Sequence, residues 1–223
     1  MSSTEYQGPE QVFDVLRKFA RPRPPVERCD LCSLELGPEH DHLFEPATRR
    51  LVCTCGPCAI LFGAQAGERF RRVPRRVRRL EDFRLTDAQW EDLRLPINLA
   101  FFFHSTQQGK VVACYPSPAG ATESLLDLAA WDEIRGENPV LDEITPDVEA
   151  LLVDRLGSDR GLGGMAGEAS CFVVPIDQCF RLVGIIRTHW KGFSGGELVW
   201  SEIDRFFDDL KRAAGSTGEM MHA

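Results

Sequence analysis

The sequence lacks any long hydrophobic run. No apolar stretch in its 223 residues approaches the roughly 18–20 residues that a helix needs to cross a bilayer. The first residues, Met-Ser-Ser-Thr-Glu, contain neither the basic segment nor the apolar segment of a secretory signal. We therefore expect no membrane insertion and a cytoplasmic location.

The sequence also lacks an excess of positive charge and a recognisable set of catalytic residues. Its 26 Lys and Arg residues stand against 34 Asp and Glu residues, which gives a formal net charge of −8. A chain this acidic is not a general nucleic-acid binder by charge alone. The glycines at 161–164 are not followed by the Lys-Ser/Thr of a phosphate-binding loop. These absences favour a role without enzymatic activity.

Cysteine, by contrast, is abundant. The chain has eight cysteines, and five of them lie between Cys29 and Cys58. Disulfides are disfavoured in the cytosol, so clustered cysteines indicate metal or redox chemistry. The pattern is Cys-x2-Cys, then twenty residues, then Cys-x-Cys-x2-Cys. Because two such turns can direct four thiolates at one ion, we predict a zinc ribbon with the ligands Cys29, Cys32, Cys55 and Cys58.

Three further side chains in this segment could reach the metal. Cys53 could replace Cys55, support it as a neighbouring thiol, or belong to the strand that leads into the turn. His40 and His42 lie between the two cysteine groups, and we expect ordinary loop residues there because four thiolates already complete a closed site. Iron of the rubredoxin type uses the same four thiolates. Zinc is the favoured metal and iron is the alternative.

The other three cysteines are scattered. Cys114 and Cys171 lie inside apolar segments, and Cys179 lies between two of them. Free buried cysteine behaves as a small hydrophobic residue. We therefore expect all three to pack in the core.

A dense run of arginines follows the cysteine segment, and no acidic residue interrupts it. With seven basic residues in this run, the remaining 19 face 34 acidic ones, so charge is segregated along the chain. The run could bind an acidic protein or RNA, or it could pair with the protein's own Asp204, Asp208 and Asp209. Nucleic acid is the less favoured partner because the interleaved Val73, Pro74 and Val77 offer no aromatic rings for base stacking. The candidate partner-binding residues are Arg69, Arg71, Arg72, Arg75, Arg76, Arg78 and Arg79.

Hydrophobic periodicity divides the chain into five parts. Thr86, with Gln89 three residues later, predicts a capping box at the start of a helix in the third part. The parts are an N-terminal helix and proline-rich linker (1–27), a zinc-ribbon-like module (28–68), an arginine-rich connector with a helix (69–96), an α+β domain (97–214) and a disordered tail (215–223).

The α+β domain is expected to contain four strands and three helices. The strands are predicted at 97–104, 111–115, 171–176 and 181–188, with a hairpin turn at 107–110. Helices are predicted to begin at Thr122 and Thr145, and a third to span 197–213 with Gly215 as its C-terminal cap. This order predicts an α+β fold in which an antiparallel sheet carries helices on one face.

Several stretches together resemble one family of bacterial, mainly actinobacterial, proteins of similar length. The stretches are CDLC, CTCGPCAILF, RRVPRRVRRLEDFRLTDAQW, YPSPAGATESLLDL, VPIDQC and RTHWKGFSGGELVW, within residues 29–210. Members of the family are encoded beside nickel–iron uptake hydrogenases. The resemblance implies an accessory role in hydrogenase assembly, maturation or electron delivery, with a hydrogenase subunit or precursor as the partner. Only the cysteines of its CxxC and CxCxxC elements carry over, as expected metal ligands.

We therefore predict a non-enzymatic, zinc-binding accessory or interaction protein. One alternative is a rubredoxin-like iron redox carrier. The other is a nucleic-acid-binding regulator that uses the arginine run.

Overall fold

The computed structural model describes residues 26–63, 69–125, 128–159, 169–192 and 195–219. The helix predicted in the N-terminal part lies outside the described residues. Within the described residues, no helix is both long enough and apolar enough to cross a membrane.

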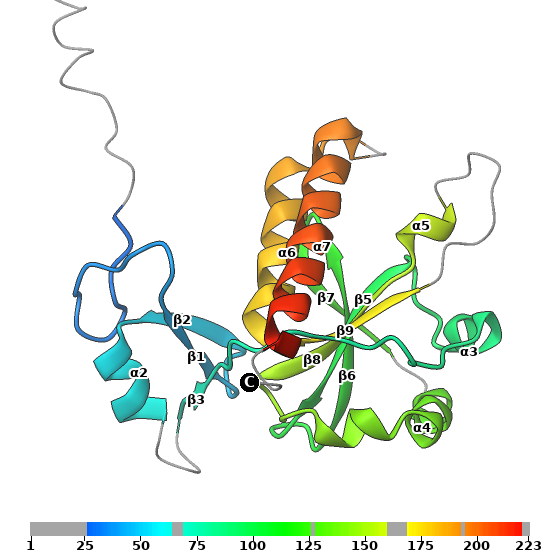
Figure 1. The fold of residues 1–223 in the computed structure, drawn as a ribbon, viewed down its shortest axis with the longest axis horizontal. Helices are drawn as coiled ribbons and strands as arrows, with labels where there is room; N and C mark the ends of the chain where they lie inside the picture. The colour runs from blue at the N-terminus through cyan, green and yellow to red at the C-terminus, as the bar shows by residue number, and fades with distance from the viewer. Residues whose placement is uncertain (1–25, 64–68, 126–127, 160–168, 193–194, 220–223) are drawn as a thin grey trace, which may run out of the picture.

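The cysteine module, residues 26–63 together with the strand formed by Arg71–Arg72, contains a small antiparallel sheet (Figure 1). Its strands are β1 (Asp41–Glu45), β2 (Arg50–Thr54) and β3 (Arg71–Arg72), in the order β2-β1-β3. Helix α2 (Gly56–Gly63) follows β2 directly. A β-bridge between Arg28 and Glu35 closes the loop that carries the first two cysteines.

The second sheet has six antiparallel strands in the order β4-β9-β8-β5-β6-β7. The central pairs are long: β8 and β9 pair over six residues, from Glu149 opposite Pro175 to Asp154 opposite Ser170. The strands are β4 (Arg78–Arg79), β5 (Leu99–Ser105), β6 (Lys110–Ser117), β7 (Gly120–Ser124), β8 (Glu149–Asp154) and β9 (Ser170–Pro175).

Two helices cover one face of this sheet, α6 (Ile176–His189) and α7 (Gly196–Glu219). Successive strand residues point to opposite faces, so Phe101 and Phe103 enter the core under α6 and α7 while Phe102 faces the other way. The opposite face is covered by α3 (Asp87–Asp92), α4 (Leu128–Glu137) and the 3-10 helix η1 (Pro139–Glu143). A short helix, α5 (Leu156–Asp159), follows β8.

The predicted fold class is confirmed: the protein is α+β, with antiparallel sheets and a cluster of four cysteines in a ribbon-like module. Helix α7 was predicted, and it lies together with α6 on one face of the large sheet. The short helices add a layer on the other face that the sequence did not predict, and Phe102 stacks there on Trp131 at a ring-centroid distance of 4.8 Å.

The individual helices and strands agree only in part with those predicted from the sequence. The capping box of Thr86 and Gln89 is present at the start of α3, and the hairpin of β5 and β6 is confirmed. Residues 181–188 were predicted as a strand and instead lie in α6. The helix predicted from Thr145 is wrong, because β8 begins at Glu149. The helix predicted from Thr122 begins only at Leu128, and α7 continues through Gly215 to Glu219.

Candidate metal centre

The first two cysteines lie on a tight loop. The backbone N–H of Cys29 donates to the carbonyl of Leu34 at 2.8 Å, and that of Ser33 donates to the carbonyl of Cys29 at 2.7 Å. Ser33 adopts a left-handed backbone conformation with φ of 63°. These bonds close the turn so that Cys29 and Cys32 lie on the same side of it.

The second pair lies where β2 ends and α2 begins. Cys55 follows the last residue of β2, and Cys58 is in the first turn of α2. The four sulfur atoms of Cys29, Cys32, Cys55 and Cys58 lie within 4.8 Å of one another, and the Cys32 and Cys55 sulfurs are 3.6 Å apart. The structure thus brings together the four cysteines that the spacing singled out.

The thiols of this four-cysteine cluster differ in acidity. Burial raises the pKa of Cys29, but backbone N–H groups of Cys55, Leu31 and Cys32 outweigh it and lower the pKa to about 6. Burial, together with hydrogen bonds that the Cys58 thiol donates to the other sulfurs, raises the pKa of Cys58 to about 12. The backbone N–H of Leu34 lowers the pKa of Cys32, yet the hydrogen bonds to Cys29 and Cys55 leave it raised.

The cluster fits a metal ion. Four thiolates are the donor set of closed tetrahedral zinc sites and of rubredoxin-type iron sites. Cys29, Cys55 and Cys58 are buried, and Leu31 and Leu36 pack against them. A buried group of thiols with one sulfur already held by backbone N–H groups is prepared for a cation. The cluster could hold a metal ion.

The three alternate ligands form a group of their own. His40 and His42 precede and enter β1, and Cys53 in β2 lies directly opposite His42. The ligand atoms of these three residues lie within 4.8 Å of one another. Burial raises the pKa of the Cys53 thiol, and the carboxylates of Asp30 and Glu27 raise it further. Sequence reasoning treated these residues separately, although the alternation of His40 and His42 along a strand was a signal that they share a face.

The arginine run connects the two sheets. Its first part forms β3 beside β1, and its last part forms β4 beside β9. Arg71 and Arg78 therefore belong to different sheets. The run is the chain segment that crosses from the cysteine module to the large domain.

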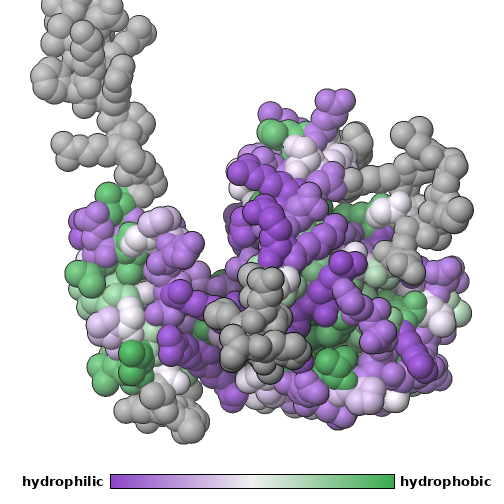
Figure 2. All heavy atoms as spheres, in the orientation of Figure 1, coloured by the Kyte–Doolittle hydropathy of each residue, from purple (hydrophilic) through white to green (hydrophobic). Residues whose placement is uncertain are grey.

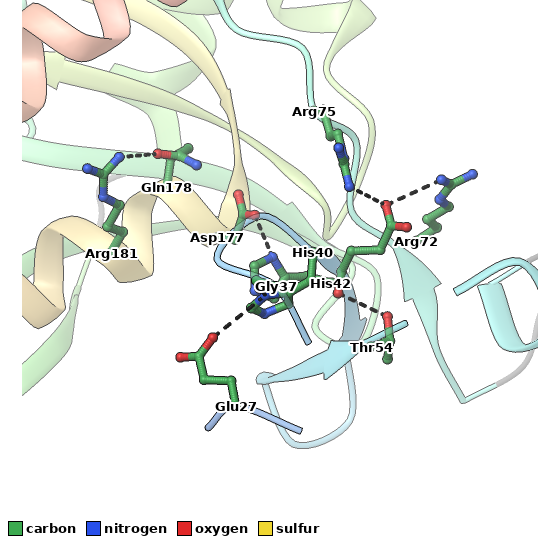
Figure 3. Close-up of polar contacts among 11 residues, drawn as sticks. Glu27, Gly37, His40, His42, Thr54, Arg72, Arg75, Asp177, Gln178 and Arg181 are labelled. Atoms are coloured by element: carbon green, nitrogen blue, oxygen red, sulfur yellow. Dashed lines mark hydrogen bonds and ion pairs between the residues drawn. The ribbon is translucent and has the colours of Figure 1, made fainter. Parts of the chain in front are cut away.

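Five of the seven arginines pair with acidic side chains of the protein itself. Arg72 and Arg75 approach the carboxylate of Asp41 at 3.4 Å and 3.2 Å (Figure 3). The other three pairs are Arg69 with Glu45, Arg71 with Asp147 at 3.1 Å, and Arg78 with Glu143 at 2.7 Å.

The acidic partners differ from those expected. Asp208 pairs instead with Lys211, and Asp209 with Arg181 and Arg212. Because most of the run is paired internally, its arginines leave less free positive charge for nucleic acid than the sequence suggested.

The scattered cysteines lie in the core. Cys114, Cys171 and Cys179 are buried, on β6, β9 and α6. Burial raises the pKa of Cys114 and of Cys171 to about 12, and that of Cys179 well above its ordinary value. Thiols that stay protonated are poor nucleophiles, and none of the three belongs to a group of candidate metal ligands among the described residues. Their environment is that of packing residues.

Comparison with curated proteins and with solved structures finds no match. A family model does match, over residues 28–214. This range begins in the loop of the first cysteine pair and extends into α7, so it includes both sheets and the four-cysteine cluster. The chain therefore belongs to the family of unknown function DUF5947.

Proposed function

We propose that this protein is a non-enzymatic accessory protein that binds a partner protein through a module held by a structural zinc ion. The observation that carries this proposal is the exposure of α2. Ile60 and Leu61 are each 61% exposed and Phe62 is 40% exposed, in a helix composed almost entirely of apolar residues. Helices that are apolar on every side are normally buried. A partner that covers α2 would account for its composition.

The rest of the module supports a binding surface. Of the eight large hydrophobic residues that are exposed in the described part of the chain, five lie in the module. Figure 2 shows hydrophobic residues on the side of the module away from the large domain. Contiguous exposed apolar surface commonly marks a protein interaction site. The five residues are Val26, Leu34, Ile60, Leu61 and Phe62.

The four-cysteine cluster supports a structural role for the ion. Four thiolates complete a tetrahedron and leave no position for water or a substrate. Cys58 lies in the first turn of α2, so an ion bound there would fix the start of the exposed helix. The free energy of ion binding would then stabilise the binding surface itself.

The partner that we would test first is a subunit or precursor of a nickel–iron hydrogenase. This choice follows from the family resemblance of the sequence stretches quoted above. Reduced thiols need a reducing compartment, so the proposed place of action is the cytoplasm. Arg76 and Arg79 are exposed and would add positive charge for an acidic partner.

The double variant Ile60→Glu/Leu61→Glu tests the surface. We expect the zinc-loaded wild type to bind a purified hydrogenase subunit in isothermal titration calorimetry. The double variant should bind at least about tenfold more weakly, because a few buried apolar residues dominate most interfaces. The matched control is Leu198→Glu, since Leu198 is 51% exposed on α7. Equal weakening by the control, or no weakening by the double variant, would refute α2 as the binding surface.

A rubredoxin-like electron carrier is the second candidate function. It is favoured by the backbone N–H groups around the Cys29 sulfur, because such bonds tune the potentials of iron–thiolate sites. Elemental analysis and absorption spectra of protein purified anaerobically, from cells supplied with both metals, separate the two. Colourless protein with zinc and without iron supports the structural role. Stoichiometric iron with visible charge-transfer bands would replace that role with electron transfer.

A further inference from the structure

We propose that His40, His42 and Cys53 form a second metal site, distinct from the four-cysteine cluster, for a late first-row divalent transition ion. Their ligand atoms lie within 4.8 Å of one another. Two imidazole nitrogens and one thiolate are donors that zinc, nickel, cobalt and copper accept, whereas calcium and magnesium require oxygen donors. This site does not depend on the proposed partner-binding role.

The backbone places the three side chains together. His40 and His42 are two residues apart where the chain enters β1, so they share a face. Cys53 is the direct cross-strand neighbour of His42 in the pairing of β1 with β2. The backbone N–H of Cys53 also donates to Asp30 Oδ2 at 3.0 Å, and the backbone N–H of Asp30 donates to the Cys53 carbonyl at 2.9 Å. Cys53 is therefore held firmly beside the first cysteine loop.

Each histidine already has one ring nitrogen engaged. His42 Nδ1 lies 2.9 Å from Asp177 Oδ2, and His40 Nδ1 lies 3.0 Å from the carbonyl oxygen of Gly37 (Figure 3). Metal-binding histidines usually donate their other N–H to a carboxylate or a backbone carbonyl, which fixes the tautomer and the ring orientation. Both rings have this arrangement, so both Nε2 atoms are the nitrogens available to an ion.

One of these Nε2 atoms is a buried polar group that the described residues leave unsatisfied. His40 Nε2 is buried and has no hydrogen-bond partner among them, and the His40 side chain is only 9% exposed. Leaving such an atom unpaired costs about 1–3 kcal/mol. The His40 and His42 rings meet edge to face with centroids 4.7 Å apart. An ion between them and Cys53 would satisfy the unpaired nitrogen.

A purely structural role explains less. The contact of His42 with Asp177 would by itself attach the cysteine module to α6, and His40 would simply fill space. That account leaves the unpaired Nε2 of His40 without a cause. The nearby carboxylates also favour a cation, since Glu27 lies 3.7 Å from His40 Nδ1 and Asp177 has a second, buried oxygen. With three ligands from the chain, a tetrahedral ion would keep one position open.

The test is a metal titration of the full chain. Zinc or cobalt(II) is added to metal-free, reduced protein in competition with a chromogenic chelator, and bound metal is counted by native mass spectrometry. We expect two ions per wild-type chain and one in His40→Ala, His42→Ala and Cys53→Ala. The control variants are His104→Ala and Cys114→Ala, whose side chains lie in the large sheet and outside both clusters. These controls should bind two ions.

A positioning variant sharpens the test. Asp177→Asn should weaken the second ion about 10–100-fold while leaving the first unchanged, because supporting hydrogen bonds to ligating histidines have effects of that size. Long-range nitrogen-15 spectra of wild-type imidazoles require no mutation. Zinc should shift the Nε2 signals of His40 and His42 and leave Nδ1 protonated.

The outcomes are decisive in both directions. One ion per wild-type chain at saturating metal, or unshifted histidine signals, would overturn the second site. So would a second ion that persists in all three ligand variants or that disappears in the controls.

Discussion

At the scale of single residues, the metal-free cysteine cluster holds its protons unevenly. Cys29, with a pKa of about 6, is a thiolate at neutral pH, whereas Cys58, with a pKa of about 12, keeps its proton. Cys32 also keeps its proton, because its pKa is raised above the ordinary value. Since only thiolates bind the metal, an ion entering at pH 7 must displace at least two protons.

The affinity of this cluster should therefore depend steeply on pH. Between pH 7 and pH 8 we expect the affinity for zinc to rise at least about 100-fold, tenfold for each displaced proton. Below pH 6 the decline should steepen, because Cys29 then takes up a proton as well. Chelator competition in the Cys53→Ala variant measures the cluster alone. A change of tenfold or less per pH unit would contradict the assigned protonation states.

Asp147 is a buried residue whose carboxylate makes several contacts. It is 1% exposed, has φ of 67°, and accepts hydrogen bonds from the N–H and the hydroxyl of Thr106 at 2.9 Å and 2.6 Å. Arg71, from the cysteine module, pairs with the same carboxylate. One carboxylate thus connects the β5–β6 turn to the connector.

Two substitutions of Asp147 should separate the contribution of its hydrogen bonds to stability from that of its charge. Asp147→Ala should lower the free energy of unfolding by about 2–4 kcal/mol, because it removes both hydrogen bonds to Thr106 and the ion pair with Arg71 and places alanine at a positive φ. Asp147→Asn should cost less, since asparagine keeps an acceptor and tolerates that backbone conformation. Urea unfolding measures both. Equal losses would show that the charge, rather than the hydrogen bonds, dominates.

At the scale of elements, features set by residues close together in sequence were predicted correctly, whereas features set by tertiary packing were not. The capping box of Thr86 and Gln89 is a contact within one turn, so four residues suffice to predict it. The strand predicted at 181–188 rested on the β-branched residues near Val183 and Ile186. In α6 these residues face the large sheet together with Cys179 and Leu182, and packing overrides the intrinsic preference.

The prediction missed strand β8 for a different reason. Ala150–Val153 are buried on both faces, so their sequence is a continuous apolar run without alternation. Such a run does not distinguish a helix from a central strand, and the Thr145-Pro146 pair favoured a helix. Only the flanking strands β5 and β9 decide the outcome.

The two candidate metal sites differ in the same way, since one is set by local sequence and the other by tertiary structure. The four-cysteine cluster was predictable because each CxxC turn sets its own geometry. The group of His40, His42 and Cys53 depends on the register of β1 against β2. Its support from Asp177 depends further on where α6 lies, 135 residues away in sequence. No local pattern contains that information.

Gly63, at the end of α2, allows a close approach that a side chain would block. A Cβ there would lie 2.9 Å from the Cβ of Arg72 and 3.0 Å from Cδ2 of Leu43. We expect Gly63→Ala to destabilise the module by about 1–3 kcal/mol through overpacking. Chelator-driven zinc release should be faster in this variant.

The matched control for this substitution is Gly184→Ala. Gly184 lies inside α6, where an added Cβ meets nothing within 4 Å. This substitution should stabilise the protein by about 0.5–1 kcal/mol, because alanine has the higher helix propensity. Unchanged zinc release in Gly63→Ala would contradict the close packing of α2 on β3.

At the scale of the whole molecule, residues of the cysteine module pack into the hydrophobic core of the large domain. Phe44 of β1 belongs to the main hydrophobic core and lies 6.4 Å from the ring of Phe180 on α6. Arg49 extends from the module to Glu123 on β7 at 2.8 Å. Loss of structure in the module should therefore affect the large domain mainly where the two are in contact.

Loss of the metal should unfold the cysteine module and leave the large domain folded. In Cys58→Ser we expect zinc to be lost and residues 26–63 to lose protection in hydrogen-exchange mass spectrometry, because binding the ion stabilises the module. β5, β8 and β9 should stay protected, since their core residues lie mainly outside the module. Retained protection across the module would contradict a structural role for the ion. Global loss of protection would contradict the division into a module and a domain.

The connector between the two sheets has a consequence for the order of events during synthesis. β3 pairs with β1, which precedes it by fewer than forty residues, so the ribbon and its four cysteines can assemble once Arg72 has left the ribosome. β4 must wait for β9, because Arg78 pairs with Val173. The nascent chain can thus acquire its ion well before the surface on which the ribbon rests has been translated.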